Sequence, residues 1–238
     1  MRAKEQMMDS SKKTAVQSGI LLICGIVFGI LSSVPALEYP DYLVKLSSIR
    51  TQVSAAIFFQ AAMATVYVGI AVLFYPVIKN YNKQLALAYF GFRIIGAAFL
   101  FAGIASLSLL SILSGDFVSA GHPDSTYFQT LGELLRKGRD LLNHIGMILP
   151  WATGGLILSL CMFKTRLVPR WLSLWGMVGI TLTLASTLLL MLGFIKMATP
   201  LYFAMNLPAA FFELFLAAYL IVKGFNPLAF KTEEKAGL

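Results

Sequence analysis

Hydrophobic and polar positions along this chain are arranged in long blocks, not in the alternating period-two pattern of β-strands. Six apolar blocks are each long enough for a helix of about 20 residues, which crosses the ~30 Å hydrocarbon core of a bilayer. We therefore predict an all-α, polytopic membrane protein with a six-helix transmembrane bundle. The predicted spans are residues 16–37, 53–78, 85–114, 141–163, 171–194 and 201–222.

The connections between these blocks are short and contain Pro and Asn, residues that end helices. None of them is long enough to form a separate soluble domain. The sequence therefore predicts a single six-span domain over residues 14–226. A basic cytoplasmic tail, residues 1–13, precedes it, and a second cytoplasmic tail, residues 227–238, follows.

Composition agrees with a lipid environment. Of 238 residues, 58% are hydrophobic and 13% are charged, whereas soluble proteins contain about 25% charged residues. A soluble globular domain, a disordered chain and a disulfide scaffold are thereby excluded. The membrane lipid itself is the first expected partner.

The net charge of +8 is explained by membrane topology. Of the Lys and Arg residues, 12 lie in the tails and connections on one side, 6 lie on the other, and Arg93 lies within a span. Lys and Arg are enriched in cytoplasmic loops, so both termini are predicted to be cytoplasmic. A nucleic-acid partner is not expected, because such proteins carry a basic face on a soluble fold.

Ionisable side chains inside a membrane span are costly and therefore informative. Four occur here, namely Arg93, Asp140, His144 and Glu213. By helix rise, Arg93 lies about 12 Å and Glu213 about 15 Å inside the same membrane face. Because each would be unpaired in a low dielectric, we predict an Arg93–Glu213 ion pair between the third and sixth spans. The alternative is that this pair only fixes the register of the helices.

A polar stripe is predicted on the fourth span and the segment before it. At 100° per residue, Glu133, Asp140, His144 and Trp151 fall within about 20° of one line. Asp140 and His144 are i,i+4 neighbours that can form a hydrogen bond. This pair would relay protons or bind a polar headgroup. The alternative is an interfacial helix end whose polar face contacts other parts of the protein.

Two uncharged polar residues extend the candidate site. Gln60 lies in the second span, and Asn206 lies near the outer end of the sixth. We predict that Gln60, Asp140, His144 and Asn206 line a cavity open to the outside. The Arg93–Glu213 pair would form the floor of that cavity.

Motifs for metal, cofactor and nucleophilic chemistry are not found. Cys24 and Cys161 both lie inside spans, where Cys is typically a small core residue. The sequence contains no CxxC, HExxH, GxSxG, P-loop or GxGxxG. We expect no cofactor and no metal, and catalytic activity is not the favoured interpretation.

Several segments resemble one family. They are VIKNYNKQLALAYFGFR (residues 77–93), RLVPRWLSLWG (166–176), ELFLAAYLIVKGF (213–225) and PDYL (40–43). The chain resembles the domain-of-unknown-function 4386 family over residues 14–226. The resemblance implies a bacterial, multi-pass protein of the cytoplasmic (inner) membrane and places Arg93 and Glu213 in recognisable motifs. In that pattern an acidic residue often follows the Arg by three positions, where this chain has Gly96, which makes Glu213 the expected counter-charge.

Three classes of function remain open. The first is binding or transport of a small polar or amphiphilic molecule, or of a lipid ligand, through the outward cavity. The second is a non-catalytic membrane scaffold or partner subunit whose buried charges only fix helix packing. The third is an intramembrane lipid-modifying enzyme. The space around Arg93 and Glu213 distinguishes the first two classes.

Overall fold

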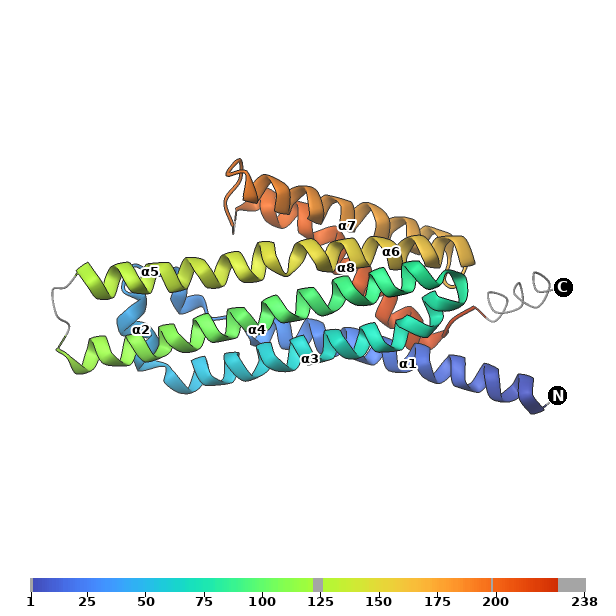
Figure 1. The fold of residues 1–238 in the computed structure, drawn as a ribbon, viewed down its shortest axis with the longest axis horizontal. Coiled ribbons are helices and arrows are strands. Elements are labelled where there is room, and N and C mark those ends of the chain that lie inside the picture. Colours follow the sequence, from blue (N-terminus) through green and yellow to red (C-terminus); the bar gives the residue numbers. More distant parts are fainter. Residues whose placement is uncertain (1, 122–125, 198, 227–238) are drawn as a thin grey trace.

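A computed structural model shows a helical protein (Figure 1). It describes residues 2–121, 126–197 and 199–226, with side chains from Ser11 onward. The helices are α1 (Arg2–Leu31), η1 (Pro35–Glu38), α2 (Tyr42–Ser48), α3 (Arg50–Tyr81), α4 (Lys83–Ser119), α5 (Thr126–Leu141), η2 (Leu142–Gly146), α6 (Ile148–Thr165), α7 (Arg170–Met191) and α8 (Pro200–Val222).

The predicted all-α membrane fold is confirmed. The described residues contain no strand. Six helical segments among them are long and apolar enough to cross a membrane. The fourth is a continuous rod, Thr126–Thr165, made of α5, η2 and α6. The region predicted as a basic N-terminal tail lies largely within α1, and the predicted tail 227–238 lies outside the described residues.

Local sequence explains where several helices begin and end. Pro35 confines Val34 to an extended conformation (φ −127°), so α1 stops at Leu31, before the predicted end of the first span. The Asn82 side chain accepts a hydrogen bond from the Leu85 amide at 2.9 Å and caps α4. Arg166 has a left-handed conformation (φ 56°) and ends α6.

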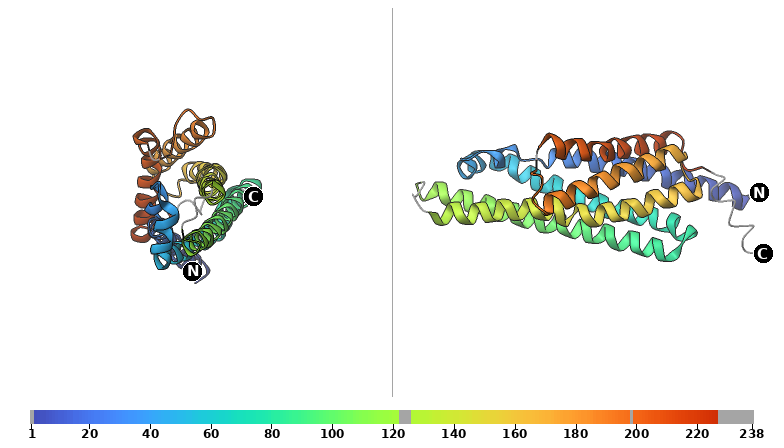
Figure 2. Two further views of the ribbon diagram at one scale, coloured as in Figure 1. Left: turned by 90° about the vertical axis from the view of Figure 1, so that its left-hand side faces the viewer. Right: turned by 90° about the horizontal axis from the view of Figure 1, so that it is seen from above.

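The six spanning segments form a closed ring. Packing contacts run in the order α1–α3–α4–α6–α7–α8 and return from α8 to α1. The end-on view in Figure 2 shows the helices around a common axis. In this ring α4 lies opposite α8, because three steps separate them in either direction. Polar side chains on inward faces of non-adjacent helices therefore face the same central region.

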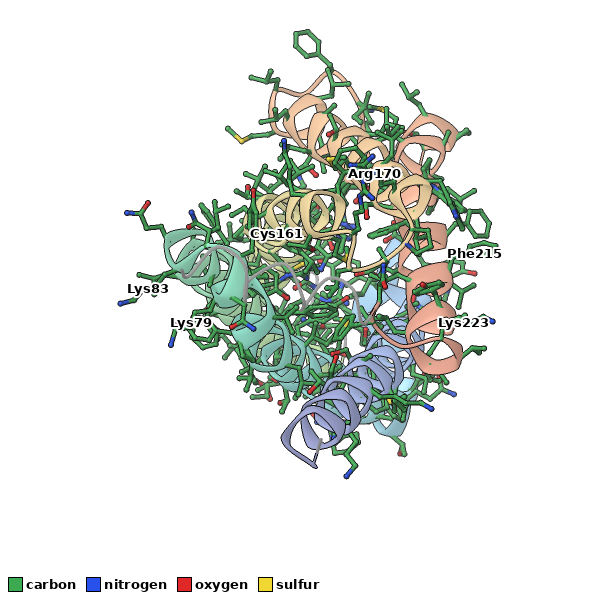
Figure 3. All side chains as sticks on the ribbon, turned by 90° about the vertical axis from the view of Figure 1, so that its right-hand side faces the viewer. Lys79, Lys83, Cys161, Arg170, Phe215 and Lys223 are labelled. Atoms are coloured by element: carbon green, nitrogen blue, oxygen red, sulfur yellow. The ribbon has the colours of Figure 1, made fainter. Side chains whose placement is uncertain are left out.

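The start of α1 and the end of α8 lie at one end of the ring (Figure 1). The α3–α4 and α6–α7 connections lie at this end, which we call the terminal end. Figure 3 looks onto it and shows Lys79, Lys83, Arg170 and Lys223. The basic loops counted together in the sequence therefore do share one side of the protein. That this side is cytoplasmic remains a prediction from the charge count.

The opposite end is a structure that we call the cap, made of η1, α2, the last turns of α4, and α5. At 1.5 Å per residue the 37 residues of α4 extend about 55 Å, well beyond a ~30 Å hydrocarbon core. Buried apolar residues of the cap, among them Leu37, Tyr42, Leu43 and Leu46, form their own core with α3 and α4. The cap therefore projects past the level of the α7–α8 connection.

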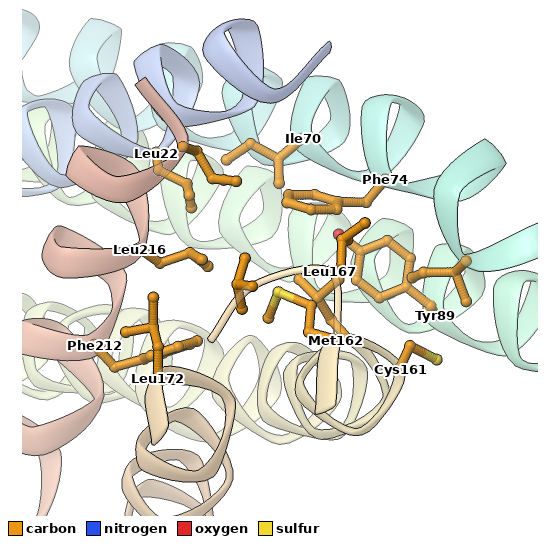
Figure 4. Close-up of a cluster of buried hydrophobic side chains, with 14 of the residues drawn as sticks. Leu22, Ile70, Phe74, Tyr89, Cys161, Met162, Leu167, Leu172, Phe212 and Leu216 are labelled. Atoms are coloured by element: carbon orange, nitrogen blue, oxygen red, sulfur yellow. The ribbon is translucent and has the colours of Figure 1, made fainter. Parts of the chain in front are cut away.

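A larger apolar core fills the terminal half of the ring (Figure 4). Leu22, Phe74, Met162, Leu172 and Leu216 come from five different helices and pack together there. Tyr89 lies in the same core, with its ring at 6.5 Å and 80° from that of Phe74. This core closes the ring toward the terminal end. Polar groups in the middle of the ring are therefore separated from that end by close-packed side chains.

Candidate functional site

The predicted polar residues lie in two layers within the ring. The first, which we call the cap-side layer, contains Gln60, Asn143, His144, Ser186, Tyr202 and Asn206. The second, which we call the central layer, contains Tyr67, Tyr89, Arg93, Trp151 and Glu213. The steps Gln60 to Tyr67, His144 to Trp151 and Asn206 to Glu213 are seven residues each. Seven residues are two helical turns, so the layers are about 10 Å apart.

The cap-side layer is connected by hydrogen bonds. Nε2 of Gln60 donates to the Leu100 carbonyl and to Oδ1 of Asn143, each at 3.1 Å. Nδ1 of His144 lies 2.8 Å from the Tyr202 hydroxyl, a hydrogen-bonding distance. The layer therefore joins α3, α4, η2 and α8.

Asn206 completes this layer on the other side. Its Nδ2 donates to Oγ of Ser186 at 3.0 Å and to the Tyr202 carbonyl at 2.7 Å. These bonds connect α8 to α7. Of the residues singled out in the sequence, Gln60, His144 and Asn206 are thus brought into one layer, as the cavity hypothesis requires.

A π-helical turn, η2, changes the phase of the fourth span. The Met147 amide donates to the Leu142 carbonyl at 2.9 Å, five residues back. One extra residue in a turn rotates the following helix by about 100°. The stripe predicted for an uninterrupted α-helix is therefore wrong beyond Leu142. This turn also directs Asn143, which the sequence analysis missed, toward Gln60.

The predicted Asp140–His144 hydrogen bond is not formed in the described part of the chain. Asp140 instead lies 3.5 Å from Nη1 of Arg139, and both side chains are largely buried. His144 pairs with Tyr202 on α8. Asp140 therefore belongs to the cap-side end of the rod and not to the hydrogen-bonded layer.

Arg93 is the most unusual side chain of the central layer. It is 6% exposed, and its Nε has no hydrogen-bond partner. Its guanidinium carbon lies 5.4 Å from the Tyr89 ring centroid and 5.3 Å from that of Trp151. Within the described residues the guanidinium forms no ion pair. Two aromatic faces thus lie beside the cation, a favourable contact that leaves its Nε donor unsatisfied.

Its neighbours are also unsatisfied donors. The Tyr89 hydroxyl and the Trp151 indole Nε1 are buried and have no hydrogen-bond partner in the part of the chain that the structure describes. The indole can only donate, as can every guanidinium N–H. Buried donors without acceptors are rare in native proteins. Nε of Arg93 and Nε1 of Trp151 are therefore buried donors without an acceptor in the described residues.

The predicted direct ion pair between Arg93 and Glu213 is wrong. Among the described residues, no nitrogen–oxygen contact within 4.0 Å joins them. The physical reason is the ring order, which places α4 opposite α8 and not beside it. The two charges still interact electrostatically, and Tyr67 and Tyr89 each feel both of them. Arg93 and Glu213 are therefore opposite charges separated by the middle of the ring.

Three side chains of this layer keep exposed surface on otherwise buried helix faces. Glu213 lies at the centre of the α8 face formed by buried Ala209, Phe212, Leu216, Ala217 and Leu220, yet it is only half-buried. Tyr67 likewise lies among buried residues of α3 and is half-buried. Trp151 lies among buried residues of α6 and is also half-buried. These three side chains therefore keep part of their surface uncovered by the described residues.

Small residues allow the helices to approach around this layer. A Cβ added at Gly96 would lie 3.3 Å from the Met147 carbonyl oxygen. A Cβ added at Gly154 would lie 3.5 Å from Nε of Arg93. An acidic side chain at position 96, as in the family pattern, would lie against the backbone of Met147 and Trp151, because its Cβ alone would be 3.3 Å and 3.6 Å from their O and N atoms.

A hollow lies in the cap. It has a volume of about 790 Å³ and is lined by residues of α2, α4, α5 and the segment before α2, among them Tyr42, Phe117 and Glu133. None of the six predicted site residues lines it. Its Glu133 is already bonded to Arg136 at 2.8 Å and lies 3.2 Å from Nζ of Lys137. The cap hollow is thus distinct from the two polar layers.

Potential metal ligands are not clustered in the described part of the chain. The described residues contain no cluster of three or more His, Cys, Asp or Glu side chains. Cys24 and Cys161 are both unpaired thiols, and Cys161 lies in the apolar core of Figure 4.

Comparison with known proteins gives one match. The model of the family described as a domain of unknown function, DUF4386, matches residues 18–224. The chain therefore belongs to this family, as its motifs indicated. Comparisons with curated proteins and with solved structures give no match.

Proposed function

We propose that this DUF4386 protein binds or moves a small polar or amphiphilic molecule through a polar cavity inside its six-helix bundle. The ligand contacts the central layer, with Arg93 and Glu213 as the principal groups. Asp140 and the cap-side residues Gln60, His144 and Asn206 line the approach from the cap. The protein resides in the bacterial cytoplasmic membrane with both termini in the cytoplasm, so the cap faces outward.

The unpaired state of Arg93 is the observation that carries this proposal. Burying a charge without a partner costs several kcal/mol, so buried charges are normally paired. A purely structural arginine would donate to a carboxylate or a backbone carbonyl on an adjacent helix. Nε of Arg93, the Tyr89 hydroxyl and Nε1 of Trp151 instead have no hydrogen-bond partner in the described residues. A ligand that supplies acceptor oxygens would satisfy all three.

The layout of the bundle supports entry from the cap. The terminal half of the ring is filled by the apolar core of Figure 4. Toward the cap, the neighbouring groups are amides, an imidazole and a phenol, which suit the passage of a polar molecule. The half-buried faces of Tyr67, Trp151 and Glu213 border the space that such a molecule would occupy.

Native mass spectrometry of the protein released from detergent micelles tests this proposal. Wild type is expected to retain a bound lipid or metabolite, and Arg93→Gln to lose it. Arg170→Gln is the matched control, because Arg170 is exposed at the terminal end, with its guanidinium carbon 5.3 Å from the Phe163 ring centroid. If wild type retains nothing in several detergents, the binding function is contradicted and the scaffold interpretation is favoured.

A further inference from the structure

We infer that the central layer recognises a zwitterion, with its anionic group on Arg93 and its cationic group on Glu213. This inference rests on the proposed binding function and specifies the chemical class of the ligand. It covers free small zwitterions, such as amino acids and betaines, and the zwitterionic headgroups of lipids. The three observations that carry it are the placement of the charges, their lack of partners and the side chains between them.

The charges occupy opposite walls of one ring. Arg93 projects from α4 and Glu213 from α8, and these helices are three steps apart around the ring. Glu213 and Trp151 each follow a cap-side residue by seven positions, and Arg93 lies 5.3 Å from the Trp151 ring centroid, which indicates a common level. Electrostatic interaction reaches across the centre, but no contact within 4.0 Å joins the two in the described residues. A ligand between them would therefore meet a cation on one side and an anion on the other.

Both groups lack a bonding partner within the bundle. Nε of Arg93 is buried and unbonded, and the carboxylate of Glu213 takes part in no hydrogen bond or ion pair in the described residues. Two complementary charges that were kept only for packing would be expected to meet directly. Their separation leaves donor capacity on one wall and acceptor capacity on the other. A zwitterion satisfies both walls at once.

Charge balance favours a zwitterion over a simple anion. The central layer holds one cationic and one anionic side chain, so its formal charge is zero. A monoanion would leave an uncompensated negative charge in a low dielectric, and a simple cation an uncompensated positive one. A zwitterion adds no net charge. The aromatic side chains of Tyr67, Tyr89 and Trp151 suit the part between its charges, and their π faces also attract an ammonium group.

Fluorescence of Trp151 provides a direct binding signal. The chain has three tryptophans, and the other two, Trp171 and Trp175, stack on each other at 6.3 Å near the terminal end. In Trp171→Phe/Trp175→Phe the remaining indole lies 5.3 Å from the Arg93 guanidinium. The probes are the series glycine, β-alanine, 4-aminobutyrate, 5-aminovalerate and 6-aminohexanoate. Each is compared with the carboxylate that lacks its amino group and the amine that lacks its carboxylate.

The expected result in this background is a tighter Kd for the zwitterion than for either matched partner. At the length that fits best, the difference is at least about tenfold, as expected for one charge-assisted hydrogen bond. The preferred chain length reports the span between Arg93 and Glu213. If the matched carboxylates bind as tightly as the zwitterions at every length, the zwitterion inference is overturned and the site is a simple anion site.

Two variants test which side chain binds each charged group of the ligand. Glu213→Gln is expected to raise the zwitterion Kd to that of the matched carboxylate, without weakening the binding of the carboxylate itself. Arg93→Gln is expected to abolish binding of both. Arg170→Gln should change neither. Because the zwitterion-to-carboxylate comparison is made first in the parent background, a variant that fails to fold does not remove the test.

Reconstitution in vesicles distinguishes a lipid headgroup from a free zwitterion as the ligand. The protein is reconstituted in phosphatidylethanolamine/phosphatidylglycerol vesicles or in phosphatidylglycerol vesicles, and native mass spectrometry identifies the lipid that it retains. Retention of phosphatidylethanolamine, lost in Glu213→Gln, identifies a zwitterionic headgroup as the ligand. Binding of the soluble series without lipid retention identifies a free zwitterion. Preferential retention of phosphatidylglycerol contradicts the inference, and the absence of any bound species contradicts the proposed function itself.

Discussion

The cap-side layer and the central layer are about 10 Å apart, contain similar numbers of polar side chains, and differ in how these side chains are satisfied. In the cap-side layer, Gln60, His144 and Asn206 each form side-chain hydrogen bonds of 3.1 Å or less to another helix. In the central layer, Arg93, Tyr89 and Trp151 have buried donors without partners in the described structure. The first arrangement joins helices and leaves one buried acceptor, Oε1 of Gln60, without a partner in the described residues, whereas the second leaves three buried groups unused.

This difference separates two roles that look alike in a sequence. A polar residue inside a membrane protein can stabilise packing if its partner lies on a neighbouring helix. It can also be retained at a cost to stability when its partner is a ligand. Substitutions in the cap-side layer should therefore lower stability, whereas neutralising both charges of the central layer should leave stability nearly unchanged.

The largest expected effect comes from adding a methyl group at Gly103, where α4 closely approaches η2 in the cap-side layer. A Cβ at Gly103 would collide with Oδ1 of Asn143 and lie 3.1 Å from Nε2 of Gln60. Gly103→Ala should therefore lower the free energy of unfolding by roughly 1–3 kcal/mol, measured in detergent. Gly91→Ala on the same helix is the matched control, since no atom lies within 4 Å of its added Cβ. That control should be neutral or stabilising by up to about 1 kcal/mol.

Removing the amide of Gln60 should have the next largest effect. Gln60→Leu deletes two hydrogen bonds and leaves Oδ1 of Asn143 without its donor. A loss of roughly 1–2 kcal/mol in unfolding free energy is expected. Gln52→Leu, at an exposed position of the same helix, should change stability by about 0.5 kcal/mol or less. Equal effects of the two substitutions would show that the cap-side layer does not stabilise the bundle.

Neutralising the central layer provides the contrasting measurement. Arg93→Met/Glu213→Gln removes both buried charges with side chains of similar size. We expect an unfolding free energy within about 1 kcal/mol of wild type, because replacing buried charges by packed neutral groups is often neutral or stabilising. Ligand retention should be abolished at the same time. A loss of about 3 kcal/mol or more would instead mean that the charges fix helix packing, as the scaffold alternative requires.

The overall fold was largely predictable, because the length and apolar character of a membrane span are local properties. Six spans and the grouping of their loops follow from the blocks of apolar residues and the positions of Lys and Arg. The ends of helices were less predictable. The α5–α6 rod begins at Thr126, well before the apolar block at residue 141, because a helix continues into water without a change in local geometry.

The sequence predicted how deep the candidate site residues lie in the membrane but not which of them contact each other. Helix rise placed Arg93 and Glu213 at one level, yet their contact depends on which helices are neighbours, a property of the ring and not of any one segment. The π turn at Leu142–Gly146 has no sequence signal comparable to an apolar block, and it redirected Asn143 and His144. A search for every amide within a span, in addition to ionisable groups, would have found Asn143.

The smallest expected effect concerns an ion pair that is exposed to water. This pair is a reference for comparison with the charges of the central layer. Asp41 lies in the cap, outside the spans, with its carboxylate 3.0 Å from Nζ of Lys45. The hydrogen bond from Lys45 lowers the pKa of the Asp41 carboxyl below its ordinary value. The pair therefore favours the folded state above that ordinary pKa, and this contribution is lost as the pH falls through the lowered pKa.

Lys45→Met should return the pKa of Asp41 toward its ordinary value, measured by NMR titration of the labelled carboxyl carbon. Thermal unfolding at neutral pH should not change measurably, because exposed ion pairs contribute little to stability. Glu133, bonded to Arg136 and Lys137, is the internal control and should titrate as in wild type. A clear loss of thermal stability in Lys45→Met would show that the cap excludes water around Asp41. The contrast between hydrated charges in the cap and unsatisfied charges in the ring would then be smaller than the structure indicates.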